Sequence, residues 1–193
     1  MLRISLNAKP ALTTHQIPQT IRSEKTPFIV KAINAAKAEL IAFLDADDEW
    51  LPNKTEIMAK CLKNHPEIKV LSSRYDVIDE NSEIIENSGV TYLGKKEDGS
   101  IEYLSAESFI GCSYVRGFSM CFTADIKPYI KPIDVKDLLS HDWYICMLGC
   151  CYGKTAILNK KLCHYRYHRD NVSLSAMNNG SGLISILAST KVK

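Results

Sequence analysis

The sequence lacks the features that mark several classes of protein. No charge of one sign dominates, since 24 basic residues stand against 22 acidic ones and the net charge is +2. This balance gives no electrostatic footprint for nucleic acid, and it fits poorly with a strongly basic membrane-surface protein. No stretch approaches the ~20 apolar residues of a membrane-spanning helix. The opening segment MLRISLNAKPALTTHQ has no long apolar core, so it does not read as a signal peptide.

The cysteines lack a recognisable pattern. Their number, seven, is odd, and no two are spaced as Cys-x-x-Cys. A zinc site would require a different spacing. We therefore interpret the cysteines as small, buried hydrophobic residues of a protein in a reducing compartment. This interpretation predicts a cytoplasmic location.

What the sequence does contain is enough apolar material for a core. With 193 residues, 46% of them apolar and 24% charged, the chain suits one globular domain. We expect an irregular segment over residues 1–27, the folded domain over 28–175 and a tail over 176–193. The apolar stretch Leu183–Ala188 in this tail could pack on the core, a partner or a membrane surface.

From Phe28 onward the pattern alternates between helices and strands. Helices are predicted over Val30–Ala38, from Pro52 to about Asn64, and over Asp142–Tyr152. Strands are predicted over Leu40–Leu44, Ile68–Ile78, Phe118–Thr123, Lys154–Leu158 and Leu162–His168. Residues 86–104 contain glycines and read as a loop or loose hairpin. The alternation predicts an α/β fold with a parallel or mixed sheet.

A cluster of carboxylates follows the predicted strand Leu40–Leu44. Asp45, Asp47 and Asp48 come directly after this apolar run, at the carboxyl end of a strand, where open α/β sheets bind their ligands. Crowded like charges are unfavourable unless a cation offsets them, and Mg²⁺ and Mn²⁺ prefer carboxylate and phosphate oxygens. The pattern fits a metal–diphosphate site. It fits equally a solvated acidic turn that caps the helix opened by Pro52.

The longer segment IAFLDADDEWLPNK, Ile41–Lys54, resembles the DxD segment of family 2 glycosyltransferases, which have the GT-A fold. The resemblance implies an α/β, GT-A-like (Rossmann-like) mixed sheet flanked by helices. It also implies that Asp45 contacts the donor nucleotide, and that Asp47 helps to hold a Mn²⁺ or Mg²⁺ ion bridging the donor diphosphate. Asp48 is a neighbour whose role varies in the family.

A second segment, Ser140–Trp143, opens the predicted apolar helix. An aspartate at a helix start is often only a cap. In the family, however, an acidic residue of an "ED"-like pair begins the corresponding helix near the acceptor and acts as the general base. The resemblance therefore implies that Asp142 is catalytic, with His141 in place of the usual glutamate.

The third segment, HYRYHRDNVS (His164–Ser173), resembles the family's late stretch that closes over the donor site. Arg166 and His168 are two positions apart in an extended chain and would share one face. Either could contact the diphosphate or the metal, so both are candidate donor ligands and His168 is a candidate metal ligand. A basic surface strand is the alternative.

The family builds part of its acceptor wall from the region that corresponds to Gly111–Phe122. Arg116 and Ser119 in this region, and Trp143 beside the predicted base, are candidate acceptor contacts.

Together these segments imply an inverting, metal-dependent transfer of a sugar from a nucleotide-sugar donor, UDP being the family expectation. The acceptor would be a glycan or a lipid-linked molecule in bacterial surface polysaccharide or lipooligosaccharide synthesis. Such a protein would be cytoplasmic, with peripheral contact to the inner face of the membrane.

The resemblance extends from about Ala32 to Ser173 and does not include the start of the chain. The family's first strands and helix are not recognisable before Phe28, so the sequence predicts an N-terminally incomplete sheet with exposed edges. A partner chain or an oligomer is one source of the missing strands. Two rival functions follow: a catalytically inactive remnant that acts as a binding or interaction module, and a metal-dependent phosphohydrolase.

Overall fold

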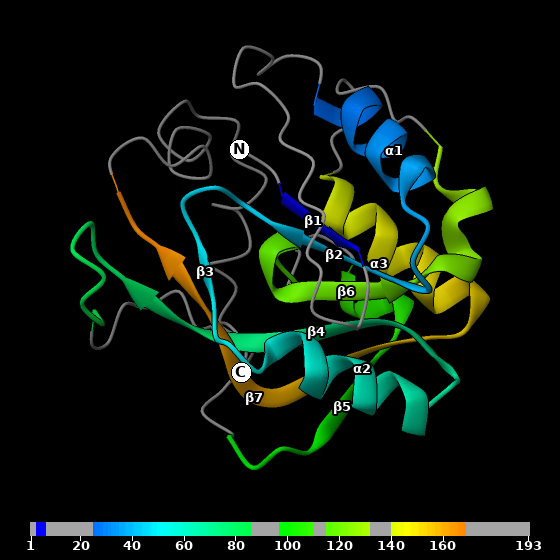
Figure 1. Ribbon diagram of the computed structural model, residues 1–193. Helices are drawn as coiled ribbons and strands as arrows, with labels where there is room; N and C mark the ends of the chain where they lie inside the picture. Colours follow the sequence, from blue (N-terminus) through cyan, green and yellow to red (C-terminus); the bar gives the residue numbers. More distant parts are fainter. Residues whose placement is uncertain (1–2, 7–24, 86–96, 110–114, 132–139, 169–193) are drawn as a thin grey trace, which may run out of the picture.

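The computed structural model describes residues 3–6, 25–85, 97–109, 115–131 and 140–168. Within them, seven strands form one sheet in the order β1-β2-β6-β4-β7-β3, with β5 also paired to β7 (Figure 1). The strands are β1 (Arg3–Leu6), β2 (Leu40–Leu44), β3 (Glu49–Trp50), β4 (Ile68–Ile78), β5 (Ile101–Leu104), β6 (Met120–Thr123) and β7 (Lys154–Arg166). Strands β4 and β7 are parallel and the other pairs are antiparallel. The mixed sheet confirms the predicted α/β class.

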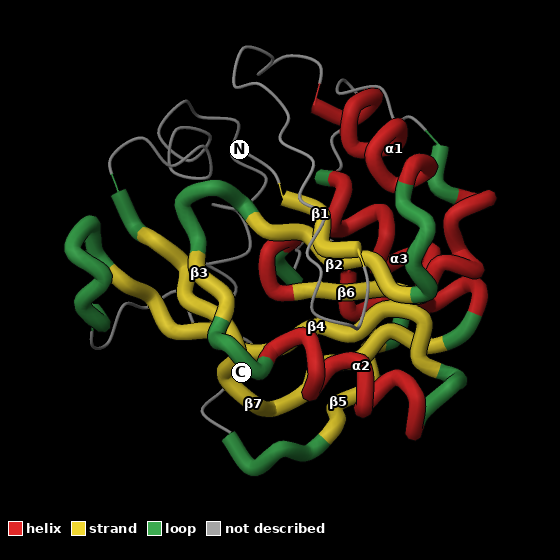
Figure 2. The backbone as a smooth tube through the Cα atoms, in the orientation of Figure 1, coloured by secondary structure: helices red, strands yellow, loops and turns green. Residues whose placement is uncertain are grey.

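Helices cover both faces of this sheet (Figure 2). The α-helices are α1 (Lys25–Ala35), α2 (Lys54–Asn64) and α3 (His141–Tyr152), and the 3₁₀ helices are η1 (Ala106–Phe109), η2 (Gly117–Ser119) and η3 (Ala124–Tyr129). Helices α1 and α3 share one core with the sheet, and α2 packs in a second core on the other face. No helix within the described ranges is both long and apolar enough to cross a membrane.

Alternation along the strands divides the side chains between these two cores. In β2, Ile41 and Phe43 pack toward α1 and α3, whereas Ala42 packs toward Met58 and Leu62 of α2. Because successive side chains of a strand point to opposite faces, a strand covered on both sides must be apolar throughout. This is the physical origin of the uninterrupted run LIAFL.

The strand directions gather several chain segments at one edge. Strand β6 is antiparallel to both β2 and β4, and β4 is parallel to β7, so β2, β4 and β7 all run the same way. Their carboxyl ends, Leu44, Ile78 and Arg166, therefore lie at the same edge of the sheet. The start of β6 lies there too, as does the start of α3, where the His141 ring contacts the Phe43 ring at 5.3 Å between centroids. We call this the carboxyl edge.

Several predicted elements differ in extent from the observed ones. The helix predicted over Val30–Ala38 is α1, which begins and ends earlier. The two strands predicted over Lys154–Leu158 and Leu162–His168 form one strand, β7, because register shifts near Arg74 let β4 pair on both sides of the polar residues between them. Part of the predicted loop is strand β5, which gains its backbone partners from β7.

The prediction that residues 1–27 are irregular is wrong at both ends of that segment. Arg3–Leu6 forms β1, with Arg3 opposite Leu44 and Leu6 opposite Ile41 of β2, and α1 begins at Lys25. Only the tertiary partner β2 supplies the backbone hydrogen bonds of so short a strand. Residues 7–24 and the predicted tail lie outside the described ranges, and the domain boundaries stay a prediction.

Candidate active site

Asp45–Asp48, which we call the acidic loop, links β2 to β3 at the carboxyl edge. The Asp48 amide donates to the Asp45 carbonyl at 3.3 Å, which turns the chain back on itself. This turn leaves Asp47 exposed and Asp45 partly exposed, while Asp48 faces inward. The three carboxylates thus have three different environments.

Asp48 is the inward-facing carboxylate, and its side chain holds the acidic loop against β7. It is 8% exposed, and its Oδ1 accepts a hydrogen bond of 2.9 Å from the Arg166 amide. Burial raises the pKa of Asp48 to about 8; the Arg166 amide opposes this rise, and the charges of Asp45 and Asp47 add to it. The like charges expected from the sequence thus act on Asp48, although burial has the larger effect.

Asp47, the exposed carboxylate of the acidic loop, contacts His168. Asp47 Oδ2 lies 2.9 Å from His168 Nε2, although the two residues are 121 positions apart in the chain. The structure thus brings together the two residues that the sequence predicts as metal ligands.

The side chains of Asp45, Asp47 and His168 are the kinds of ligand that suit a divalent cation which also binds substrate. Among the described residues, no group of three histidine, cysteine, aspartate or glutamate side chains is arranged to enclose a metal ion. Mg²⁺ and its relatives usually take one or two carboxylates from the protein and complete their coordination with water and substrate phosphates. Asp47, with Asp45 in the same loop and His168 opposite it, offers such a partial set.

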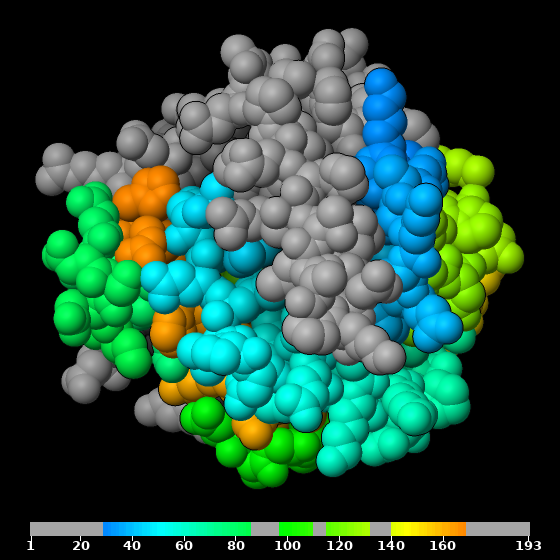
Figure 3. All heavy atoms as spheres, viewed as in Figure 1, coloured from blue at the N-terminus to red at the C-terminus, as the bar shows by residue number. Residues whose placement is uncertain are grey.

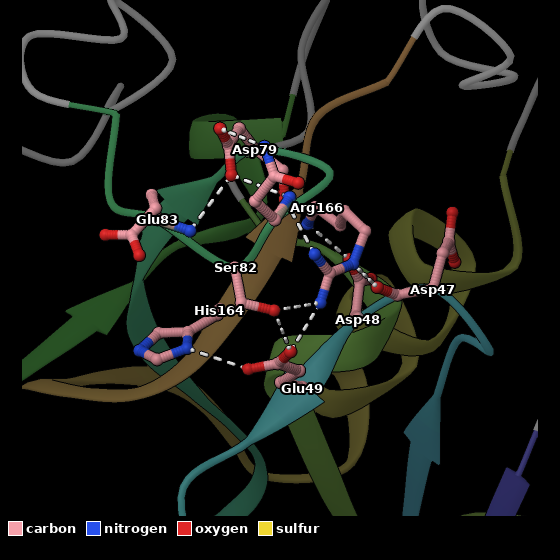
Figure 4. A network of polar contacts seen from close by, with 9 residues as sticks. Asp47, Asp48, Glu49, Asp79, Ser82, Glu83, His164 and Arg166 are labelled. Atoms are coloured by element: carbon pink, nitrogen blue, oxygen red, sulfur yellow. Dashed lines mark hydrogen bonds and ion pairs between the residues drawn. The ribbon is translucent and has the colours of Figure 1, made fainter.

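Arg166 ends β7 and binds several backbone and side-chain acceptors (Figure 4). Its Nε donates to the Asp47 carbonyl at 2.9 Å, and its Nη1 donates to the Asp79 carbonyl at 2.6 Å. Its Nη2 donates to Ser82 Oγ at 2.9 Å and forms an ion pair with Glu49. The sequence predicts that Arg166 binds the sugar-nucleotide donor. In the structure, however, its guanidinium donates to acceptors of the protein itself.

Glu49, Ser82 and Asp79 are site residues that the sequence reasoning missed. Glu49 faces His164 across the β3–β7 pair, with 3.3 Å between Oε2 and Nδ1, and it also accepts from Ser82. Its position next to the acidic loop was a signal that could have been used. Ser82 and Asp79 lie in an ordinary polar turn after β4, which carries no such signal.

Asp142 lies in the first turn of α3 and is 8% exposed. Its Oδ1 accepts a hydrogen bond of 2.9 Å from the Trp143 amide, one of the amides that a helix start leaves without an intrahelical partner. The N-cap position of α3 is Ser140, so Asp142 is not the cap residue; its contact with the Trp143 amide lies within the first turn and orients the carboxylate there.

Arg116 lies close enough to Asp142 to interact with it electrostatically. Burial by itself would lower the pKa of Arg116, but Tyr75 and Asp142 raise it above its ordinary value. Tyr75 is itself buried, and it interacts with both Arg116 and Asp48.

The other two candidate acceptor residues face inward. Ser119 is 1% exposed; its hydroxyl donates to the Arg116 carbonyl at 2.7 Å and lies 2.8 Å from Ser72 Oγ. Trp143 packs against the core and donates from Nε1 to the Phe109 carbonyl at 2.8 Å. In this structure both side chains support the backbone around the site.

A buried lysine that the sequence did not indicate as a site residue lies behind the acidic loop. Lys54 is 1% exposed, donates to the Phe118 carbonyl at 2.5 Å and lies 4.5 Å from the Trp50 ring centroid. Trp50 Nε1 donates to the same carbonyl at 2.9 Å. Burial lowers the pKa of Lys54, against the opposing effects of Cys163, Cys121 and Asp48.

Comparison with known proteins identifies the family. The sequence profile described as "Glycosyl transferase family 2" matches residues 16–122. The chain belongs to this family. An uncharacterized glycosyltransferase of Nostoc sp. is 27% identical over 143 residues, which is 74% of this chain and 44% of that protein. An uncharacterized glycosyltransferase of Methanocaldococcus jannaschii is 44% identical over 55 residues, 28% of this chain and 19% of that protein.

The family match confirms the predicted family and supports the predicted transferase class. It begins at residue 16, earlier than the predicted start at Ala32, and it includes the acidic loop and Arg116. Asp142, Arg166 and His168 lie beyond it, and their roles stay predictions. The chain spans less than half the length of either relative.

Proposed function

We propose that this domain transfers a sugar from a nucleotide-sugar donor, UDP-linked by family expectation, to a hydroxyl of a glycan or lipid-linked acceptor, with inversion and with a divalent cation. The observation that carries the proposal is the arrangement of the carboxyl edge. Asp47, His168 and the buried carboxylate of Asp142 all lie at this edge, although they belong to segments that are far apart in the chain.

On the leaving-group side, the acidic loop serves the donor. Asp45 would contact the nucleotide, and Asp47 with His168 would hold Mn²⁺ or Mg²⁺. An ion held there would offset the negative charge that grows on the departing diphosphate. Two carboxylates in one short loop, those of Asp45 and Asp47, favour a cation at this position.

On the acceptor side, Asp142 serves as the base. The acceptor oxygen forms its bond to the anomeric carbon as the bond from that carbon to the diphosphate breaks, and the acceptor proton passes to the Asp142 carboxylate. The hydrogen bond from the Trp143 amide orients that carboxylate. A positioned base of this kind contributes roughly 10²–10⁴-fold to the rate.

Three finer points belong to the same proposal and come from the sequence and its family resemblance. They are a role in bacterial surface polysaccharide or lipooligosaccharide synthesis, a cytoplasmic location with contact to the inner membrane face, and the use of an oligomer or a partner chain. Each is proposed for the protein as a whole.

Calorimetric titration of UDP and UDP-sugars, with and without Mn²⁺, tests the donor site. We expect binding that needs the metal and that Asp47→Ala abolishes. Glu56→Gln, which removes an exposed carboxylate from α2, is the matched control and should bind as the wild type does.

Two outcomes would favour the rival functions. Absence of binding to any nucleotide sugar would leave the inactive remnant as the better description. Metal-dependent release of phosphate from simple phosphate esters, lost in Asp47→Ala, would favour the phosphohydrolase.

A further inference from the structure

We propose that Arg166, Glu49 and Ser82 form a clamp that sets the shape of the acidic loop, so that Arg166 is a positioning residue and not a ligand of the donor. The assignment of the loop to donor binding rests on the proposed function. The clamp itself rests on contacts among the described residues.

The clamp joins all three segments that leave the carboxyl edge. The Arg166 guanidinium, at the end of β7, donates to the Asp47 carbonyl after β2 and to the Asp79 carbonyl after β4. The Arg166 amide donates to the Asp48 carboxylate. In the space-filling view, the end of β7 (orange) lies between the segment after β2 (cyan) and the turn after β4 (green) (Figure 3).

Glu49 provides the charged partner of Arg166. Its carboxylate accepts from Ser82 Oγ at 2.9 Å, lies 3.3 Å from His164 Nδ1, and forms the ion pair with Arg166 Nη2. A carboxylate with three donors has little freedom to rotate. Because Glu49 directly follows Asp48 in the chain, fixing Glu49 also fixes the end of the acidic loop.

Ser82 is held in a backbone conformation that only a well-determined turn maintains. Its φ is +67°, in the left-handed region, which costs a non-glycine residue on the order of 1 kcal/mol or more. Asp79 Oδ1 maintains the turn by accepting from the amides of Asn81 and Glu83 at 2.8 and 2.9 Å. The result is a serine hydroxyl placed between Glu49 and Arg166 (Figure 4).

The engagement of Arg166 determines its role. Nε, Nη1 and Nη2 all donate to protein acceptors, so turning the guanidinium toward a diphosphate would break contacts with Asp47, Asp79 and Glu49 at once. The arrangement resembles the outer partners of metal ligands, whose removal typically reduces metal affinity about 10–100-fold.

Three variants weaken the clamp from different sides: Ser82→Gly, Glu49→Gln and Arg166→Lys. Ser82→Gly permits the same φ and removes only the hydroxyl. Lys161→Gln is the matched control, because it breaks the 2.8 Å ion pair with Asp76 across the same two strands without touching the acidic loop.

The first measurement is hydrogen exchange of the Asp48 and Arg166 amides by NMR in metal-free protein. Both amides are hydrogen-bonded in the structure. We expect faster exchange in all three clamp variants, and wild-type exchange in Lys161→Gln. The second measurement is calorimetric affinity for Mn²⁺ in the presence of UDP, which should fall about 10-fold or more in the same three variants.

One pattern overturns the proposal: wild-type exchange and affinity in Ser82→Gly and Glu49→Gln, with affinity lost only in Arg166→Lys, which would make Arg166 a direct ligand. Equal losses in Lys161→Gln would also overturn it, since the effect would then be general destabilisation. Should wild-type protein bind no nucleotide, the proposed function fails, and the exchange data alone still decide the clamp. Should Arg166→Lys not fold, the other two variants decide it.

Discussion

Asp142 combines a structural and a proposed chemical task in one side chain. Its Oδ1 accepts from the Trp143 amide, so it helps to satisfy the first turn of α3. The family resemblance makes it the candidate base, and it lies close enough to Arg116 to interact with it electrostatically. A substitution that keeps the amide contact separates the two tasks.

Asp142→Asn is such a substitution, because the asparagine carbonyl still accepts from the helix amide but is not basic. We expect the transfer rate to fall roughly 10²–10⁴-fold, while the dissociation constant of the donor changes little. Steady-state transfer to an acceptor and calorimetric titration of the donor measure the two quantities. A parallel loss of donor binding would show that Asp142 is structural.

Lys54 shows how a buried charge can be tolerated at this site. Its ammonium contacts the Phe118 carbonyl and the Trp50 ring, and Trp50 donates to the same carbonyl. The Phe118 carbonyl therefore keeps a donor when the lysine is removed. The stem of Lys54 fills space between α2 and the sheet, so volume should matter more than charge.

We therefore expect Lys54→Met to change the free energy of unfolding by less than about 1.5 kcal/mol. Lys54→Ala should cost about 3 kcal/mol, because it loses the hydrogen bond and leaves a cavity. Urea denaturation of the two variants makes the comparison. Equal costs would mean that the ammonium, not the stem, provides the stabilisation.

At the scale of elements, α3 packs against the sheet without room for a side chain at Gly149. A side chain at Gly149 would place its Cβ 2.4 Å from Thr155 Oγ1 and 2.6 Å from Val70 Cγ2, and both residues are fully buried. The missing side chain thus lets α3 approach β4 and β7. This approach sets the position of the helix whose first turn carries Asp142.

Gly149→Ala should consequently destabilise the fold by about 1–2 kcal/mol, because overpacking exceeds the gain in helix propensity. Cys151→Ala, at an exposed position of the same helix, should be close to neutral. Chemical denaturation of both variants is the measurement. A stabilised Gly149→Ala protein would contradict the packing described for α3.

At the scale of the whole molecule, the carboxyl edge unites segments from most of the described chain. The acidic loop, the turn after β4, the start of α3 and the end of β7 are all held there by contacts across the sheet. A ligand bound at this edge would therefore stabilise the folded state as a unit.

UDP with Mn²⁺ at about 100 times its dissociation constant should add about 2.7 kcal/mol to stability. For a chain of this size that corresponds to a rise of roughly 5–10 °C in Tm. Differential scanning fluorimetry should show this rise with both ligands and its loss when EDTA is added. A rise that survives EDTA would show that the donor site does not need the metal.

Local sequence patterns were sufficient for the main elements. Three elements form as predicted: the strand Leu40–Leu44, the strand Ile68–Ile78 and the helix from about Asp142. Each of them is marked by a pattern of apolar residues that are close together in the sequence. The α/β class also predicted that the acidic loop lies at the carboxyl end of a strand, where such sheets usually bind ligands. Elements that depend on a distant partner, such as β1 and β5, were missed.

What the sequence alone determined is the family, the α/β class and the presence of an acidic loop after a buried strand. Only the tertiary structure decided which carboxylate is buried, that His168 meets Asp47, and that Arg166 binds the loop and the turn after β4. The physical reason is separation along the chain: Arg166 and Asp79 are 87 positions apart, and Arg166 and Asp48 are 118 apart. Contacts of that kind arise from strand order and direction, which no local pattern encodes.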